Sequence, residues 1–317
     1  MKKGAIITAI VLLSAGLLIF VGGLFMGGSF RPVEAETKTY PVTEPFTDIH
    51  IETQETDIVF LLSTDGTCSV EGAETEKVHL NVSVENGALT VTTVDERTWV
   101  DRLIPHVDQP MQIRLPETAY KTLSVESHTG DVTVPDSFAF EQVRITASTG
   151  DVTCGASSED AIEITAGTGD ITLDGVRAKT ASLAVSTGRI TVRGASVSGD
   201  VIVSVSTGKI ELDRLTCSAL RSEGSTGDAT LKDVIVKDTL WIKRSTGDVT
   251  LERCDAATVR IETDTGDVSA SLLSEKIFVT KTNTGKVRIP DTQSGGRCEI
   301  STSTGDIRIE LVGTAQP

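Results

Sequence analysis

The sequence predicts an all-β protein whose larger part is a parallel β-solenoid, preceded by one transmembrane helix. Three observations predict this: a Thr-Gly corner that recurs ten times, alternating β-branched residues around each corner, and an uncharged apolar segment near the N-terminus. The expected organisation is a membrane anchor over residues 1–30, a linker over 31–39, an N-terminal β cap over 40–117, solenoid repeats over 118–311 and a tail over 312–317.

The repeat is defined by ten glycines that each follow a threonine, at spacings of 19 or 20 residues. These corner glycines are Gly130, Gly150, Gly169, Gly188, Gly208, Gly227, Gly247, Gly266, Gly285 and Gly305. Glycine suits a sharp corner because such a turn commonly requires a positive φ, which is costly for other residues. Repeats of this length predict one coil each, stacked in parallel at about 4.8 Å per coil.

Apolar residues alternate on both sides of every corner. Around Gly169, for example, Ile171 and Leu173 follow the glycine, and Ile162 and Ile164 precede it. Alternation with a period of two predicts two short strands per repeat, each with one buried face. Helical repeats have longer periods and a 3.6-residue periodicity, neither of which is present here.

Residues 37–117 contain strand patterns without the regular corner. Asn86-Gly87 separates two such patterns and is a strong hairpin signal. Because the end of a solenoid exposes an unpaired strand edge, we expect this region to be a partly antiparallel cap. The chain ends soon after the last repeat, so the edge at the C-terminal end of the solenoid is expected to remain available for self-association.

Residues 4–30 carry no charge, and residues 5–26 are predominantly apolar. A spanning helix needs about 20 apolar residues, whereas the core of a signal peptide has about 7–15. Lys2 and Lys3 precede the segment, which directs the N-terminus to the cytoplasm and the rest of the chain outside. We therefore expect a single-pass protein of the cell membrane with an extracellular C-terminal domain. Val33-Glu34-Ala35 resembles a cleavage site, so a cleaved signal peptide is the alternative.

The formal net charge of −16 argues against a nucleic-acid partner, because binders of phosphate backbones need basic patches. The cysteines have no CxxC spacing and occupy different phases of the repeat, so we expect buried free thiols rather than disulfides or a zinc site. These cysteines are Cys68, Cys154, Cys217, Cys254 and Cys298.

Aspartate follows the corner glycine in seven repeats, which raises the question of calcium binding. These residues are Asp131, Asp151, Asp170, Asp228, Asp248, Asp267 and Asp306, and the row is interrupted by Arg189, Lys209 and Lys286. Calcium-binding β-rolls use a glycine-rich nine-residue repeat that is absent here. We therefore expect each carboxylate to accept hydrogen bonds from the amides of its own turn, and we assign no metal ligand and no cofactor.

A catalytic site is not expected either. No interval between corners exceeds 20 residues, so no inserted loop encloses a substrate cleft. The histidines, His50, His79, His106 and His128, are scattered, and Ser127 and Asp131 accompany His128 only through proximity along the chain. We assign no catalytic residue; a polysaccharide-active β-helix enzyme is a remote alternative.

The order of several motifs resembles the bacterial “putative adhesin” family of β-strand-repeat domains, a group of unknown function. The motifs are Pro45-Phe46-Thr47-Asp48-Ile49-His50-Ile51, Glu85-Asn86-Gly87-Ala88-Leu89-Thr90-Val91, Ile113-Arg114-Leu115-Pro116 and the Ser-Thr-Gly-Asp-Val corners, over roughly residues 40–310. The resemblance implies a surface-exposed, membrane-anchored solenoid and supplies no catalytic residues. Some relatives are connected with envelope-stress signalling.

Two functions follow from these expectations. The first is a non-catalytic cell-surface solenoid that presents an extended face to an extracellular or envelope macromolecule, for adhesion or envelope scaffolding, since repeat proteins bind through long regular surfaces. The second is an envelope-stress sensor or accessory protein that acts through a membrane partner.

Overall fold

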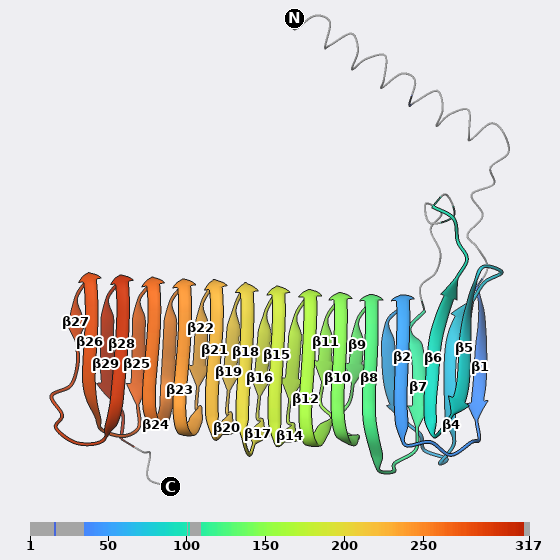
Figure 1. Ribbon diagram of the computed structural model, residues 1–317, viewed down its shortest axis with the longest axis horizontal. Helices are drawn as coiled ribbons and strands as arrows, with labels where there is room; N and C mark the ends of the chain where they lie inside the picture. Colours follow the sequence, from blue (N-terminus) through green and yellow to red (C-terminus); the bar gives the residue numbers. More distant parts are fainter. Residues whose placement is uncertain (1–15, 17–34, 100, 102–108, 314–317) are drawn as a thin grey trace, which may run out of the picture.

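The computed structural model describes residues 16, 35–99, 101 and 109–313, and the described residues from 35 onward form a β rod (Figure 1). Two sheets built mostly of parallel strands make up its opposite sides, so the predicted parallel β-solenoid is confirmed. The expected membrane helix over residues 1–30 lies outside this part of the chain, apart from residue 16. No helix among the described residues is long and apolar enough to cross a membrane.

One sheet, here called the long-strand sheet, contains the strands that lead into the corners. In spatial order from the cap these are β5 (Val78–Glu85), β6 (Ala88–Asp95), β2 (Asp48–Glu55), β8 (Tyr120–Thr129), β10 (Ala139–Thr149), β12 (Ser157–Thr168), β15 (Thr180–Thr187), β18 (Asp200–Thr207), β21 (Ala219–Thr226), β23 (Ile235–Thr246), the second half of β24 (Val249–Thr265), β28 (Gly296–Thr304) and β26 (Lys276–Thr284).

The other sheet, here called the short-strand sheet, contains the strands that leave the corners. In the same order these are β1 (Glu36–Val42), β4 (Cys68–Glu74), β7 (Met111–Leu115), β3 (Ile58–Leu62), β9 (Val132–Val134), β11 (Val152–Cys154), β13 (Ile171–Asp174), β16 (Ile190–Arg193), β19 (Ile210–Asp213), β22 (Ala229–Lys232), the first half of β24, β25 (Val268–Leu272), β29 (Ile307–Leu311) and β27 (Val287–Arg288). Two-residue strands β14 (Arg177–Ala178), β17 (Ser196–Val197) and β20 (Thr216–Cys217) lie on the return path to the next coil.

The core runs between the two sheets and follows directly from the alternation in the sequence. In one coil, the three valines of β18 and the residues Ile210 and Leu212 of β19 point inward and are at most 2% exposed. Their neighbours on each strand point outward, as the pleat requires. The same pattern recurs from coil to coil and fills the rod with Val, Ile and Leu.

The corner glycines meet two requirements at once. All ten have a positive φ, between +118° and +155°, as the sequence predicted. In addition, a Cβ atom on Gly169 would lie 2.0 Å from the carbonyl oxygen of Gly150 in the preceding coil, and at the other corners the corresponding distance is 1.8–2.5 Å. A side chain at these positions would therefore strain the backbone and push neighbouring coils apart.

The cap combines antiparallel and parallel pairing, so the expectation of a partly antiparallel cap is confirmed. The hairpin β5–β6 and the pairs β1–β4 and β4–β7 are antiparallel. In contrast, β2 and β3 stack in parallel on β8 and β9. The corner between β2 and β3 contains Thr56 in place of glycine, and the parallel stack thus includes residues 48–62.

The side chain of Glu74 connects the outermost strand of the cap to its neighbours through hydrogen bonds. Its side chain is 4% exposed and accepts hydrogen bonds from Lys38 Nζ at 2.7 Å, from the Tyr40 hydroxyl and from the amide of Leu80 at 3.0 Å. Burial would raise the pKa of Glu74, but these hydrogen bonds outweigh it and hold the pKa below its usual value. The carboxylate therefore joins β1, β4 and β5 in its charged form.

The far end of the rod corrects one expectation. The last repeat in the sequence is not the terminal coil, because β28 and β29 lie between β24–β25 and β26–β27. The inward position occupied by Ile300 in β28 is occupied by Thr280 in β26. Placing the more apolar repeat inside buries Ile300 and leaves the threonine at the solvated end. Among the described residues, the unpaired edge therefore belongs to β26 and β27.

All five cysteines are buried and free, as the sequence predicted. Burial raises the pKa of the thiols to about 11 for Cys68 and Cys254 and to about 12 for Cys154, Cys217 and Cys298. A thiol with so high a pKa stays protonated and behaves as a small apolar side chain at neutral pH.

Candidate functional site

The corner aspartates connect neighbouring coils. Asp131 Oδ1 accepts a hydrogen bond from the backbone N–H of Asp151, and Asp151 Oδ1 accepts one from the N–H of Asp170, each at 2.7 Å. The prediction that each carboxylate binds its own turn is therefore wrong. Stacking at about 4.8 Å brings the next coil's amide within reach, which the sequence cannot show. The corner row thus has a structural role.

Two of the three cations that interrupt the row form ion pairs with acidic residues of the next coil. Lys209 Nζ lies 3.4 Å from Asp228 Oδ2, and Arg189 Nε lies 3.7 Å from Glu211 Oε1. Within the part of the chain that the structure describes, no group of three or more His, Cys, Asp or Glu side chains could hold a metal ion.

The residues around His128 do not form a Ser-His-Asp arrangement. Ser127 is buried, and its hydroxyl donates a hydrogen bond to the carbonyl oxygen of Gly130 at 3.3 Å. His128, the next residue on the strand, is exposed, and its Nδ1 lies 3.3 Å from the carbonyl oxygen of Thr53. Since successive residues of a strand point to opposite faces, the two side chains cannot cooperate. His106 lies outside the described residues.

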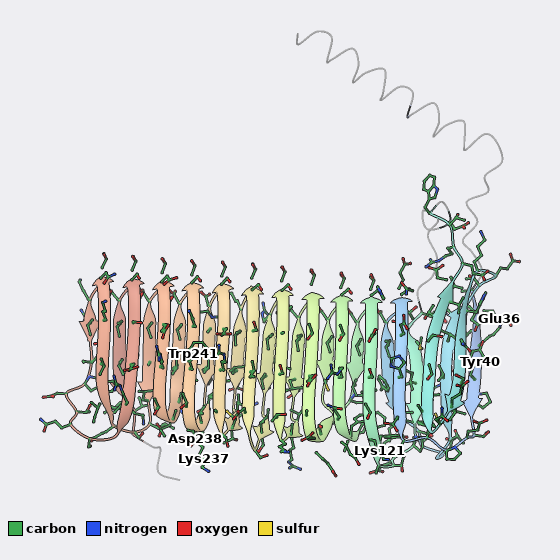
Figure 2. All side chains as sticks on the ribbon, in the orientation of Figure 1. Glu36, Tyr40, Lys121, Lys237, Asp238 and Trp241 are labelled. Atoms are coloured by element: carbon green, nitrogen blue, oxygen red, sulfur yellow. The ribbon has the colours of Figure 1, made fainter. Side chains whose placement is uncertain are left out.

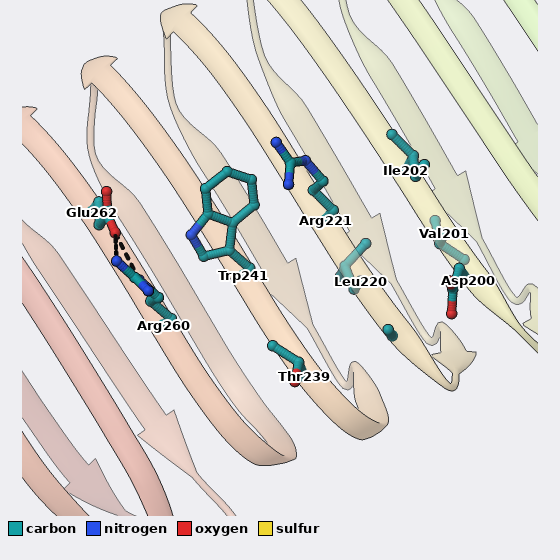
Figure 3. A pocket seen from close by; sticks show the side chains of 10 residues that line it. Asp200, Val201, Ile202, Leu220, Arg221, Thr239, Trp241, Arg260 and Glu262 are labelled. Carbon is teal, nitrogen blue, oxygen red and sulfur yellow. Dashed lines mark hydrogen bonds and ion pairs between the residues drawn. The ribbon is translucent and has the colours of Figure 1, made fainter.

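The most distinctive outward surface surrounds Trp241 on the long-strand sheet. Figure 2 shows Trp241 midway along its strand on the broad side of the rod, and Figure 3 shows it between Arg221 and Arg260. The three residues occupy aligned outward positions on β21, β23 and β24. Stacking of three coils therefore brings together side chains that are about twenty residues apart in sequence.

Charged side chains around the indole are held in place by ion pairs. The guanidinium carbon of Arg221 lies 4.0 Å from the Trp241 ring centroid, a cation–π contact. Arg221 Nη2 also donates to Glu223 Oε1 at 2.7 Å, and Arg260 Nε donates to Glu262 Oε1 at 2.7 Å. Each arginine is thus oriented by a glutamate two residues further along its own strand.

These residues line a shallow depression of about 600 Å³, here called the Trp241 face. Its lining consists of Asp200, Val201, Ile202, Ala219, Leu220, Arg221, Thr239, Trp241, Arg260 and Glu262. A smaller depression of about 180 Å³ shares Arg260 and Glu262 and continues toward the terminal coil as far as Lys281. The two together extend over the strands from β18 to β26.

The Trp241 face offers recognition chemistry. An indole presents a flat apolar surface, arginines donate several hydrogen bonds, and carboxylates accept them. The sequence analysis did not identify this face. The face could have been found by aligning the position six residues before each corner glycine. In successive repeats this position is occupied by Ile202, Arg221, Trp241 and Arg260.

The opposite side of the rod is more uniform. Threonines occupy aligned outward positions of the short-strand sheet in consecutive coils, as the pairings Thr133–Thr153 and Thr172–Thr191 show. Threonine is favoured on exposed strands, so this row needs no ligand to explain it. It provides a reference surface for tests of the Trp241 face.

Comparison with known proteins identifies a matching family. A family model described as Toastrack DUF4097 matches residues 46–204 and 198–316. No match to the chain is found among curated proteins.

Several solved structures are similar to this chain. A “putative adhesin” from Bacteroides fragilis NCTC 9343 shares 14% identity with a TM-score of 0.41, covering 87% of this chain and 97% of its own. A “putative adhesin” from Parabacteroides distasonis ATCC 8503 shares 11% identity with a TM-score of 0.47, covering 85% and 97%. A “putative lipid binding protein” from the same organism shares 14% identity with a TM-score of 0.46, covering 86% and 96%.

Proposed function

Because the chain belongs to the Toastrack DUF4097 family, we propose that it is a non-catalytic cell-surface β-solenoid that binds an extracellular or envelope macromolecule for adhesion or scaffolding. The observation that carries the proposal is the Trp241 face, where aromatic, cationic and acidic side chains from neighbouring coils form one continuous shallow depression. A shallow extended surface suits a polymer or another protein, whereas a small molecule is usually bound in a more enclosed pocket.

The proposal includes attachment to the cell membrane through residues 5–26, with the N-terminus in the cytoplasm and the solenoid outside. Its support comes from the sequence, namely the length of the apolar segment and the preceding Lys2 and Lys3. Protease added to intact cells should degrade the solenoid. Full protection in intact cells, together with degradation after lysis, would contradict the extracellular location.

Site-specific photo-crosslinking in cells tests the binding face. A photoreactive residue at Lys243, two residues beyond Trp241 on the same outward side, should give a discrete adduct that Trp241→Ala weakens at least tenfold. The same probe at Thr250, on the opposite sheet, should not give that adduct. Equal adducts from both sides, or adducts that are unaffected by Trp241→Ala, would contradict the assignment of the face.

Exchanging the apolar segment for an unrelated spanning helix separates adhesion from stress signalling. Binding through the Trp241 face should survive the exchange, because the helix then serves only as an anchor. If the cellular function is lost while crosslinking from Lys243 persists, envelope-stress sensing through a membrane partner is the better description.

We also propose self-association of two copies through the terminal coil. Ile277, Val279, Val287 and Ile289 are 41–50% exposed on this one coil. Strand β26 also has an unpaired edge, and two such edges related by a two-fold axis can pair antiparallel. The full-length protein should therefore form a concentration-dependent dimer that Val279→Lys weakens and Ile235→Lys, on an inner coil, does not. A monomer at all concentrations would contradict this.

A further inference from the structure

Trp99 is the most exposed large apolar side chain among the described residues, at 77% exposure. It follows β6, in the segment that rises beyond the row of corners at the cap end of the rod (Figure 1). An indole so open to water is costly in an isolated soluble domain, since tryptophan contributes a large apolar area. This exposure leaves the indole accessible to a partner.

The residues on both sides of Trp99 are fixed by ion pairs. On one side, Arg97 is 11% exposed and binds Asp95 at 2.8 Å and Glu55 at 2.7 Å. On the other side, Asp101 accepts hydrogen bonds from the N–H and hydroxyl of Thr98, both at 2.7 Å. Described residues on both sides of Trp99 are therefore held to the cap by polar contacts.

The turn lies beside the point where the chain enters the rod. Asp101 binds Lys77 Nζ at 2.8 Å, and Lys77 lies three residues after Glu74. Glu74 pairs with Glu36, the first residue of β1. Figure 2 shows Glu36 at the cap end of the rod. Thr37 also donates a hydrogen bond to Gln109 at 2.9 Å. Trp99 and the start of β1 therefore belong to the same end of the molecule.

Only residues 27–35 separate the apolar segment from β1, and nine extended residues span about 30 Å at most. If residues 5–26 cross the membrane, the start of β1 must lie within that distance of the bilayer. Tryptophan is enriched at membrane–water interfaces, where its apolar ring and its N–H group are both satisfied.

We propose that the side chain of Trp99 docks into the interface of the lipid bilayer and thereby sets the orientation of the rod relative to the membrane. This inference rests on the proposed membrane attachment. The partner is the bilayer itself, and the contact acts as a second, reversible attachment beside the anchor. The corner side of the cap then faces the membrane.

Fluorescence of the full-length protein in phosphatidylcholine vesicles tests the inference. The chain has two tryptophans, so Trp241→Phe leaves Trp99 as the only one. Lipids brominated near the headgroup end of the acyl chains should quench Trp99 about twofold, because an interfacial indole lies at that depth. Aqueous iodide should quench it only weakly. The matched variant Trp99→Phe retains Trp241, whose fluorescence should be quenched by iodide and not by brominated lipids.

Flotation of the protein with the same vesicles separates the proposed docking of Trp99 from the proposed membrane attachment. Protein that floats and shows brominated-lipid quenching of Trp99 supports the inference. Protein that floats while Trp99 is quenched by iodide and not by brominated lipid overturns it and leaves membrane attachment standing. Protein that does not float overturns membrane attachment, and the docking of Trp99 fails with it.

Discussion

The guanidinium of Arg244 lies over Gly224 of the preceding coil, with Nη1 only 1.6 Å from where a Cβ atom on Gly224 would be. The two residues are register partners on β23 and β21. Arg244 is 1% exposed, and none of its three nitrogens has a hydrogen-bond partner within the described part of the chain. Burial lowers the pKa of Arg244 to about 10, so the group is still charged at neutral pH.

Replacing this charge should stabilise the solenoid. Arg244→Met keeps much of the side-chain volume and removes a buried unpaired charge, so we expect a gain of about 1–4 kcal/mol in unfolding free energy. Denaturant unfolding measures it. Arg144→Met is the matched control, because Arg144 is largely exposed and pairs with Glu163 on the surface; its change should stay within about 1 kcal/mol. A loss of stability in Arg244→Met would show that the guanidinium is paired in solution.

A corner glycine should be far less replaceable than a glycine in an open turn. Gly169 and Gly175 lie in the same coil and both have positive φ, +137° and +67°. Only at Gly169 would a Cβ meet the preceding coil; at Gly175 nothing lies within 4 Å. Gly175→Ala should cost about 1 kcal/mol, whereas Gly169→Ala should cost more than about 4 kcal/mol. Similar losses in thermal melting of the two variants would contradict close stacking of the corners.

The buried thiols should make the fold sensitive to alkaline pH. Burial raises the pKa of Cys154 from 9.0 to about 12. A group whose folded pKa is raised contributes stability that is fully present below its unfolded pKa and is lost as the pH rises toward the folded value. The melting temperature should therefore fall from about pH 9 upward, and less so in Cys154→Val. A thiol reagent should react at pH 8 only after unfolding. Rapid labelling of the native protein would contradict burial.

The terminal coil should depend on one ion pair whose lysine is buried and whose aspartate is 28% exposed. Lys276 is 2% exposed, and its Nζ lies 2.7 Å from Asp255 Oδ1 on β24. To reach Asp255, the side chain of Lys276 extends across Gly296, its register partner on the intervening strand β28. Asp255→Asn leaves the ammonium buried without its counter-charge, at a cost of about 3–5 kcal/mol.

Hydrogen exchange measures this effect locally. In Asp255→Asn, the amides of β26 should exchange at least about 100-fold faster, with little change in the inner coils, because repeat proteins open at their ends first. Asp160→Asn is the control, since its pair with Lys179 is more than 60% exposed on both sides. Unchanged protection of β26 in Asp255→Asn would contradict the role of this pair.

Local sequence pattern was sufficient for the coil itself. The period of two, the corner spacing and the Asn86-Gly87 hairpin predicted the strands, the positive φ of Gly169 and the burial of Cys154, because these properties depend on a residue and its near neighbours in sequence. The position of Trp241 on an outward row could also be read by aligning residues six before each corner, although the sequence analysis did not do so.

Stacking decided what the sequence left undetermined. The patterns before Gly285 and Gly305 are alike, so the sequence does not show which repeat is terminal. In the structure, the inner repeat carries Ile300 where the terminal coil has Thr280, and Lys276 of the terminal coil pairs with Asp255. An aspartate such as Asp131 can serve its own turn or the next coil, and the choice depends on a neighbouring amide about twenty residues away. The sequence by itself determined the shape of each coil, since that shape follows from local backbone and side-chain preferences. The order of the coils, and therefore the surfaces that they share, depended on contacts that exist only in the folded rod.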